Sequence, residues 1–412
     1  MRRILRRLQP AQLAARGVTL GTAMSLIMAS NGVPTAATAA GAAISSPFKL
    51  IDNRVFVSAR LDGQGPYSFL LDTGADGWTV SAKLAHRLAL GQGRAEQIAG
   101  VGEAQETVHD LVLRGMNVAG LRFVDQPAVS EDFSSLNQVI GFQHFDGIAG
   151  KPVFDRYVVD LDFARSRVRF SRPREYPLRS DAMLIPFKFY EKVIPIVRGE
   201  IAGAKGLFVV DLGDRSSLTL FGPFWRAHHL QRLLGPGIIA LTGYGVGGPV
   251  KGELVRVRDF LMAGIHVRGV IARLSLQKAG VFGTSAIAGS IGTGILKRFN
   301  VTFDYRGRRI AFYREPGRDV ADAADRSGLW LGRRAKKFEV FDVVPKSPAD
   351  LAGIKVGDIV TAVDGIRTER LNLFAVREEL KSPAKKAISM TIEHDARSRI
   401  VPIALHDLIP ND

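Results

Sequence analysis

The feature that most constrains the fold of this chain is an internal repeat built around two acidic turns. A strand-like run ends in an Asp-x-Gly turn at residues 67–74, and a second run ends in another such turn at residues 206–213. Three apolar residues precede each acid, which is Asp72 in the first run and Asp211 in the second. Recurrence of a segment at long range is the mark of a duplicated structural unit.

The repeat extends well beyond the two acids, so that residues 53–172 resemble residues 193–314. Both copies contain a helix-like run, a glycine-rich turn, a segment with matched glycine, arginine and aromatic residues, and a hairpin pattern with period-two alternation. The paired segments are 82–90 and 223–234, 99–102 and 243–248, 147–157 and 289–299, and 158–170 and 300–312. We therefore expect a mainly β protein with two duplicated lobes.

Two aspartates delivered by symmetric turns suit the hydrolysis of a peptide bond. One group must take a proton from water while another polarises the carbonyl, and two adjacent carboxylates that share one proton do both. Like charges this close cannot both ionise, so one pKa rises. Asp72 and Asp211 are therefore the candidate catalytic pair. Gly74 and Gly213 would let the backbones approach, and Thr73 would brace the opposite loop.

The glycine-rich turns of the two copies are candidates for hairpin flaps over a cleft. The candidate flap residues are Gly100, Val101 and Gly102 in the first copy and Tyr244 and Gly245 in the second. A substrate would lie extended under these turns and pair its backbone with the flap strands.

The run Asp72–Ala75 resembles the active-site signature of retropepsin-like (clan AA) aspartic peptidases of bacteria. The runs at 148–150 and 290–292 resemble the hydrophobic-hydrophobic-glycine element beneath each catalytic loop, and the resemblance covers about residues 53–314. It implies a two-lobed, pepsin- or retropepsin-like acid protease fold. It also implies an aspartic endopeptidase that acts on proteins or peptides and needs no cofactor.

The second copy departs from the family pattern at two positions. Leu212 replaces the bracing threonine, and Asp214 stands where a small residue is usual. Asp214 would either add a third carboxylate and raise the pKa of the pair or cap the helix that follows, and we favour the cap. Asp211 has a purely structural alternative, because an acid that ends a strand needs no catalytic role. Family members that have alanine at the position of Ala75 lack a hydroxyl there. The resemblance to them implies activity at a pH nearer neutrality than that of gastric-type relatives.

The chain after residue 327 resembles the PDZ domains attached to bacterial envelope proteases. The runs 347–360 and 363–365 carry the resemblance, which covers about residues 328–406. In such domains a peptide adds to a sheet edge opposite a helix, expected here at 372–380, and loop amides hold its carboxylate. The residues expected in that loop are Gly328, Leu329, Trp330 and Leu331. The alternative is a packing domain whose groove is blocked or empty, since Trp330 is bulky.

The first residues have the pattern of an export signal. Residues 1–17 hold five arginines and no acid, and the apolar run 18–29 follows. Small residues at 36–40 fit cleavage after Ala39. The apolar run is shorter than the ~20 residues that a spanning helix needs. We expect a bacterial periplasmic or secreted protein, with a retained membrane anchor as the alternative.

Composition argues against several classes of site. The chain has no cysteine, which excludes disulfides, thiolate metal sites, a thiol nucleophile and a lipidated cysteine. Its eight histidines lack His-Glu-x-x-His spacing, and no Gly-x-Ser-x-Gly turn occurs, so we expect no metal site. The formal net charge of +16 is explained by scattered exposed charge, and we expect no nucleic-acid partner.

The expected organisation is a signal peptide followed by two lobes, a linker and a PDZ domain. The boundaries are 1–39 for the signal, 40–178 and 179–314 for the lobes, 315–327 for the linker and 328–412 for the PDZ domain. We expect an exported aspartic endopeptidase whose PDZ domain selects or positions substrates or binds a C-terminal peptide. The alternative is a catalytically impaired pseudopeptidase that acts as a peptide-binding adaptor, an alternative supported by Leu212 and Asp214. The sequence does not indicate the oligomeric state.

Overall fold

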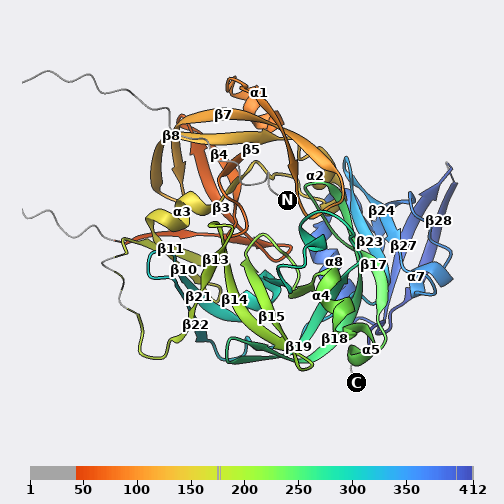
Figure 1. Cartoon of the computed structure of the whole chain (residues 1–412). Helices are drawn as coiled ribbons and strands as arrows, with labels where there is room; N and C mark the ends of the chain where they lie inside the picture. Colours follow the sequence, from red (N-terminus) through yellow and green to blue (C-terminus); the bar gives the residue numbers. More distant parts are fainter. Residues whose placement is uncertain (1–42, 174–175, 177, 396, 411–412) are drawn as a thin grey trace, which may run out of the picture.

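The computed structural model describes residues 43–173, 176, 178–395 and 397–410 (Figure 1). The predicted signal peptide, residues 1–39, lies outside these described residues. The described part is mainly β, with a two-lobed body and a separate C-terminal module, which confirms the predicted fold class. No helix among the described residues is both long enough and apolar enough to cross a membrane.

Each lobe is built on an eight-stranded sheet, and the two sheets have equivalent strand orders. In spatial order the first sheet holds β2 (Lys49–Ile51), β3 (Arg54–Leu61), β4 (Gln64–Leu71), β9 (Gly147–Ala149), β5 (Trp78–Ser81), β8 (Leu121–Glu131), β7 (Gln105–Val118) and β6 (Ala95–Ala99). The second holds β13 (Lys188–Tyr190), β14 (Ile194–Ile201), β15 (Ala204–Asp211), β20 (Gly289–Gly292), β16 (Leu218–Leu220), β19 (Ile265–Ser275), β18 (Gly248–Met262) and β17 (Ile238–Gly245). Even the extra pairings correspond, because β3 pairs with β7 and β14 pairs with β18.

A six-stranded sheet joins the two lobes. Its order is β1 (Ile44–Pro47), β11 (Arg167–Ser171), β10 (Val158–Asp162), β21 (Phe299–Asp304), β22 (Arg309–Arg314) and β12 (Met183–Pro186). At its centre β10 runs antiparallel to β21, with Val159 opposite Phe303 and Leu161 opposite Val301. The two hairpins matched in the sequence therefore meet each other and hold the lobes together.

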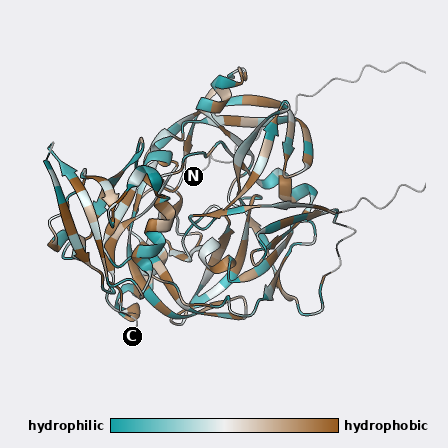
Figure 2. Ribbon diagram, turned by 180° about the vertical axis from the view of Figure 1, so that it is seen from behind, coloured by the Kyte–Doolittle hydropathy of each residue, from teal (hydrophilic) through white to brown (hydrophobic). Residues whose placement is uncertain are grey.

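One apolar core runs through both lobes and under the joining sheet. Bands of hydrophobic and hydrophilic residues alternate along many of its strands, as a sheet with one buried face requires (Figure 2). At the lobe boundary Phe154 stacks on Tyr305 with ring centroids 5.2 Å apart and meets Phe303 edge-on at 5.7 Å. Residues of both copies thus share one buried interior.

Short helices complete the lobes. They are α1 (Ala82–Arg87), α2 (Ser134–Ile140), α3 (Lys151–Arg156), α4 (Gly222–Ala227), α5 (Leu230–Leu234), the 3-10 turn η1 (Val281–Gly283) and α6 (Thr293–Leu296). The prediction of one continuous helix-like run at 223–234 is wrong, because the segment forms two helices, α4 and α5. His229 has a left-handed backbone with φ of 51°, which ends α4 and starts α5.

The C-terminal module has its own sheet and its own core. The strands are β23 (Leu329–Arg334), β24 (Lys337–Val343), β25 (Ile359–Val363), β26 (Ile366–Arg367), β27 (Ala387–His394) and β28 (Arg397–Ala404), and the helices are α7 (Pro348–Leu351), η2 (Thr368–Arg370) and α8 (Leu373–Lys381). The segment before this module is fixed at both ends. Asp322 accepts a hydrogen bond from Arg298 of the second lobe at 2.8 Å, and Arg326 donates to the carbonyl of Leu405 at 3.1 Å.

Candidate active site

Asp72 and Asp211 lie at the ends of the equivalent strands β4 and β15, and their carboxyl groups lie close enough to interact directly. The amide of Gly74 donates to Asp72 Oδ1 at 2.7 Å, and that of Gly213 donates to Asp211 Oδ1 at 2.7 Å. A Cβ atom on Gly74 would lie 2.9 Å from Asp211 Oδ1, and one on Gly213 would lie 2.5 Å from Asp72 Oδ2. Glycine at both positions is what allows the carboxyl groups to meet.

Burial raises the pKa of both aspartates. For Asp211 the rise is large, because the negative charges of Asp72 and Asp214 add to the effect of burial. For Asp72 the effect of burial is opposed by the hydrogen bond from the Gly74 amide. Two carboxyl groups this close cannot both ionise. The pair therefore keeps one proton well above the pH at which an isolated aspartate ionises, and Asp211 has the higher affinity for it.

Thr73 connects the loop that carries Asp72 to the second lobe. Its buried hydroxyl donates to the carbonyl of Val210 at 2.8 Å and accepts from the amide of Leu212 at 3.0 Å. Leu212 has no hydroxyl with which to return these bonds. Instead the hydroxyl of Thr293 in α6 donates to the Leu212 carbonyl at 3.1 Å, so the second loop is held from within its own lobe.

Gly150 and Gly292 lie against the two loops that carry Asp72 and Asp211. The amide of Gly150 donates to the carbonyl of Gly77 at 3.0 Å, and a Cβ atom on Gly150 would lie 2.5 Å from the Ala75 carbonyl oxygen. A Cβ atom on Gly292 would likewise lie 2.2 Å from the Ser216 carbonyl oxygen. The glycine elements identified in the sequence therefore lie where any larger residue would displace a loop.

The expectation that Asp214 caps the next helix is wrong. Strand β16 follows it, and α4 begins only at Gly222. The buried Asp214 side chain accepts from Thr219 Oγ1 at 2.9 Å and lies 3.5 Å from Arg273 Nη2. Burial alone would raise the pKa of Asp214. The charge of Arg273 and the hydrogen bonds outweigh burial and lower the pKa below its ordinary value, so the group stays ionised. The structure thus matches the other alternative, a third carboxylate whose charge raises the pKa of Asp211.

A buried ion cluster lies beside the loop that carries Asp211. The sequence analysis did not predict it. Asp52 accepts from Arg54 Nη1 at 2.6 Å and from Arg215 Nη2 at 2.6 Å, and Arg54 Nε donates to the Gly213 carbonyl at 3.0 Å. Burial alone would raise the pKa of Asp52, but Arg215, Arg54 and Arg377 hold it well below its usual range. No local motif marks this cluster, because Asp52 and Arg215 are 163 residues apart.

The two glycine-rich hairpins contact each other. The Gly102 amide donates to the Val246 carbonyl at 2.9 Å, and a Cβ atom on Gly245 would lie 2.5 Å from Val101 Cγ2. The Gly100 carbonyl accepts from the amide of Val281 in η1 at 2.9 Å. Four of the five predicted flap residues therefore make contacts at one junction between the lobes. They are Gly100, Val101, Gly102 and Gly245.

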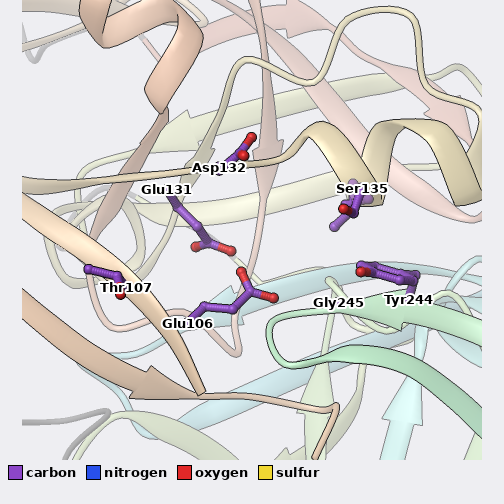
Figure 3. Close-up of a pocket in the computed structure, with 8 residues that line it drawn as sticks. Glu106, Thr107, Glu131, Asp132, Ser135, Tyr244 and Gly245 are labelled. Atoms are coloured by element: carbon purple, nitrogen blue, oxygen red, sulfur yellow. The ribbon is translucent and has the colours of Figure 1, made fainter. Parts of the chain in front are cut away.

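Tyr244 and Gly245 line a cavity of about 250 Å³ beside this junction (Figure 3). Glu106 of β7 and Glu131 of β8 point toward each other across it. Burial, with the charges of Glu106 and Asp132, raises the pKa of Glu131 to about 8. Glu131 is therefore largely protonated at neutral pH, which reduces charge repulsion inside the cavity.

The predicted carboxylate-binding loop of the C-terminal module already has partners in the segment that precedes the module. The amide of Gly328 donates to Asp325 Oδ1 at 2.7 Å, and the amide of Leu329 donates to Ser327 Oγ at 3.1 Å. Leu329, Trp330 and Leu331 belong to strand β23 and not to a loop. Two of the amides expected to bind a peptide carboxylate are thus engaged within the chain.

Trp330 and Leu331 are also engaged. The Trp330 indole donates to the carbonyl of Val139 in the first lobe at 2.8 Å, and Arg377 Nε of α8 donates to the Leu331 carbonyl at 3.1 Å. The arrangement corresponds to the alternative of a packing domain with a blocked groove.

Comparisons with known families agree with the two resemblances drawn from the sequence. Residues 57–142 match the aspartyl protease family, and residues 339–394 match the PDZ domain family. No curated protein matches the chain. The resemblance to a retropepsin-like aspartic peptidase with a C-terminal PDZ domain is confirmed. The aspartyl protease match includes Asp72 and ends before the second lobe, so Asp211 rests on the structural repeat.

Replacement of Thr73 by valine should destabilise the protein, because it leaves the buried Val210 carbonyl and Leu212 amide without partners across the lobe boundary. We expect a loss of about 1–3 kcal/mol in the free energy of unfolding, measured by urea denaturation. Thr73→Ser keeps the hydroxyl and serves as the control. Equal stability of Thr73→Val and Thr73→Ser would show that these bonds do not hold the loops together.

Proposed function

We propose that this protein is an aspartic endopeptidase in which Asp72 and Asp211 together activate a water molecule. The observation that carries the proposal is the meeting of two buried carboxyl groups on loops of equivalent construction, one from each lobe. The aspartyl protease and PDZ matches support the broader class, a protease with a peptide-binding type of domain.

In the proposed reaction the pair begins with one proton. The ionised carboxylate, assigned to Asp72, takes a proton from water as the water oxygen bonds to the peptide carbonyl carbon. The protonated Asp211 donates its proton to the carbonyl oxygen, giving a tetrahedral gem-diol. Asp72 then gives its proton to the amide nitrogen while Asp211 takes one from a diol hydroxyl. The carbon–nitrogen bond breaks, and the pair returns to its starting state.

The substrate would lie extended beneath the two glycine-rich hairpins. Because the Gly102 and Val246 backbones are hydrogen-bonded to each other, these hairpins must separate before a chain can enter. The released backbone groups would then be available to the substrate. Both lobes come from one chain, so the proposed site needs no second copy.

We also propose export to the periplasm or the outside of a bacterial cell, with removal of residues 1–39. The basic and apolar N-terminal segments support this location, and a cysteine-free chain is compatible with it. For the mature chain we propose the lobe boundaries 40–178 and 179–314, the linker 315–327 and the PDZ domain 328–412.

A peptide-binding pseudopeptidase is the second candidate function. Two observations favour it: the second loop lacks a returning hydroxyl at Leu212, and the ionised Asp214 adds negative charge beside Asp211. Binding of an unfolded protein without turnover would support this function.

The decisive test is turnover of an unfolded protein substrate from pH 4 to pH 8. Asp72→Asn and Asp211→Asn should each lower the rate by at least about 1,000-fold, because the two residues act as one unit. Asp76→Asn, four residues after Asp72 on the same loop, is the control and should retain activity. Full turnover in Asp211→Asn would exclude the proposed pair.

Removal of the Asp214 charge should shift the pH dependence of turnover. Activity needs one proton on the pair and is lost as pH rises through the raised pKa of Asp211. Asp214→Asn should lower that pKa and move the alkaline limb of kcat/KM to lower pH by about one unit. Circular dichroism would check folding, since Arg273 loses its partner. An unchanged limb, or a rate maximum below about pH 3 in the parent protein, would contradict this account.

A further inference from the structure

We propose that the C-terminal module is an intramolecular latch, which holds the second-lobe flap closed while α2 of the first lobe fills its peptide groove. A segment that takes the place of α2 in the groove would release the flap and speed substrate entry. The predicted gain in turnover rests on the proposed peptidase function, whereas the predicted release of the flap does not.

The groove is closed from within at the edge of β23. In the described part of the chain β23 is an edge strand of its sheet and faces α8, and an edge strand is the position at which a peptide adds by backbone pairing. The carbonyl of Leu331 on this strand accepts from Arg377 Nε at 3.1 Å. Arg377 projects from α8, so its side chain bridges the space between strand and helix. It occupies a hydrogen-bonding position that an incoming backbone amide would need.

The carboxyl end of α2 is seated against the same strand and helix. The Val139 carbonyl accepts from the Trp330 indole at 2.8 Å and from Arg377 Nη2 at 3.3 Å. Gly141 ends α2 in a left-handed conformation with φ of 89°. A Cβ atom there would lie 2.2 Å from Leu373 Cδ2 of α8. The first lobe therefore supplies the segment that occupies the groove.

The docked module also touches the flap of the second lobe. Asp342 Oδ2 on β24 accepts from the amide of Leu241 on β17 at 2.6 Å. Strand β17 ends with Tyr244 and Gly245, the predicted flap residues of the second lobe. Figure 1 shows the module lying against β17 and α2. Movement of the module away from the lobes would remove this acceptor from the flap.

A third contact reaches the second catalytic loop. Arg377 Nη1 lies 3.8 Å from Asp52 Oδ1, and Asp52 binds Arg215, which follows the Asp211–Asp214 loop. Burial lowers the pKa of Arg377 to about 10, which leaves it charged at neutral pH. One arginine thus contacts the groove strand, the α2 carbonyl and the ion cluster behind the catalytic loop.

The junction can part without unfolding either body. The module has its own apolar core, and the lobes share another. Among the described residues, the contacts between them include hydrogen bonds, the Arg377–Asp52 ion pair and the packing of Trp330 and Phe374 on a small apolar cluster of the first lobe. A cavity of about 570 Å³ opens beside the end of α2, lined in part by Gln138, Phe142 and Arg333. It gives a route by which a competing segment can reach the groove.

The test combines hydrogen exchange with turnover in the full chain. Trp330→Ala removes the indole that holds Val139 and leaves the core of the module intact. Ile400→Ala, on an exposed position of β28, is the matched control. Amide exchange across residues 238–248 should accelerate by at least about tenfold in Trp330→Ala and stay unchanged in Ile400→Ala. Unchanged exchange of β27 and β28 would show that the module remains folded.

A synthetic peptide with the sequence of residues 132–143 is the probe for the groove. It should compete with α2, accelerate exchange across 238–248 in the parent protein and increase turnover in a saturable way. Trp330→Phe keeps the ring but loses the N–H group and should give an intermediate effect. The latch proposal would be overturned if amide exchange across residues 238–248 were unchanged in Trp330→Ala. It would also be overturned if that exchange became faster while turnover became slower. Faster exchange with no turnover in any variant would support the latch and contradict the peptidase function.

Discussion

Two buried carboxyl groups, those of Asp72 and Asp211, meet across the boundary between the lobes. Two ionised carboxylates would repel each other strongly in a buried site, and a shared proton removes that repulsion. The backbones must also be held close for the two groups to meet. Gly74 and Gly213 provide the space, since a side chain on either would collide with the opposite aspartate. Thr73 fixes the separation of the loops by bonding across the boundary. The joining sheet, with one hairpin from each copy, keeps the lobes in register.

The second loop meets this constraint differently from the first. It lacks a threonine, and Thr293 holds it from within its own lobe instead. It also carries the ionised Asp214, whose charge is balanced by Arg273. Charged groups surround this loop, with Arg54 bonded to the Gly213 carbonyl. The two halves of the site therefore have the same backbone geometry but different electrostatics, which gives Asp211 the higher affinity for the shared proton.

The sequence was enough to predict a mainly β protein with two lobes, because the repeat consists of local patterns that recur in one order. The same patterns predicted that Asp72 and Asp211 pair, and the structure brings the two residues together. Their catalytic role stays a prediction. The sequence was not enough to predict the ion cluster at Asp52 or the seating of α2 in the groove. Those contacts join residues 163 and 238 positions apart, and no local period reports them. The favoured role of Asp214 as a helix cap was wrong for the same reason, since its partner Arg273 lies on a distant strand. The left-handed residue that splits α4 from α5 is a non-glycine, His229, so nothing in the sequence pattern marked it.

Carboxyl carbon NMR of selectively labelled aspartate would show whether Asp72 and Asp211 hold one proton between them. Assignment by Asp72→Asn and Asp211→Asn would identify the two resonances. We predict two separate ionisations, with the second proton lost well above the ordinary aspartate pKa of about 3.9. If both resonances titrated together near pH 4, the carboxyl groups would be independent and the account would be wrong.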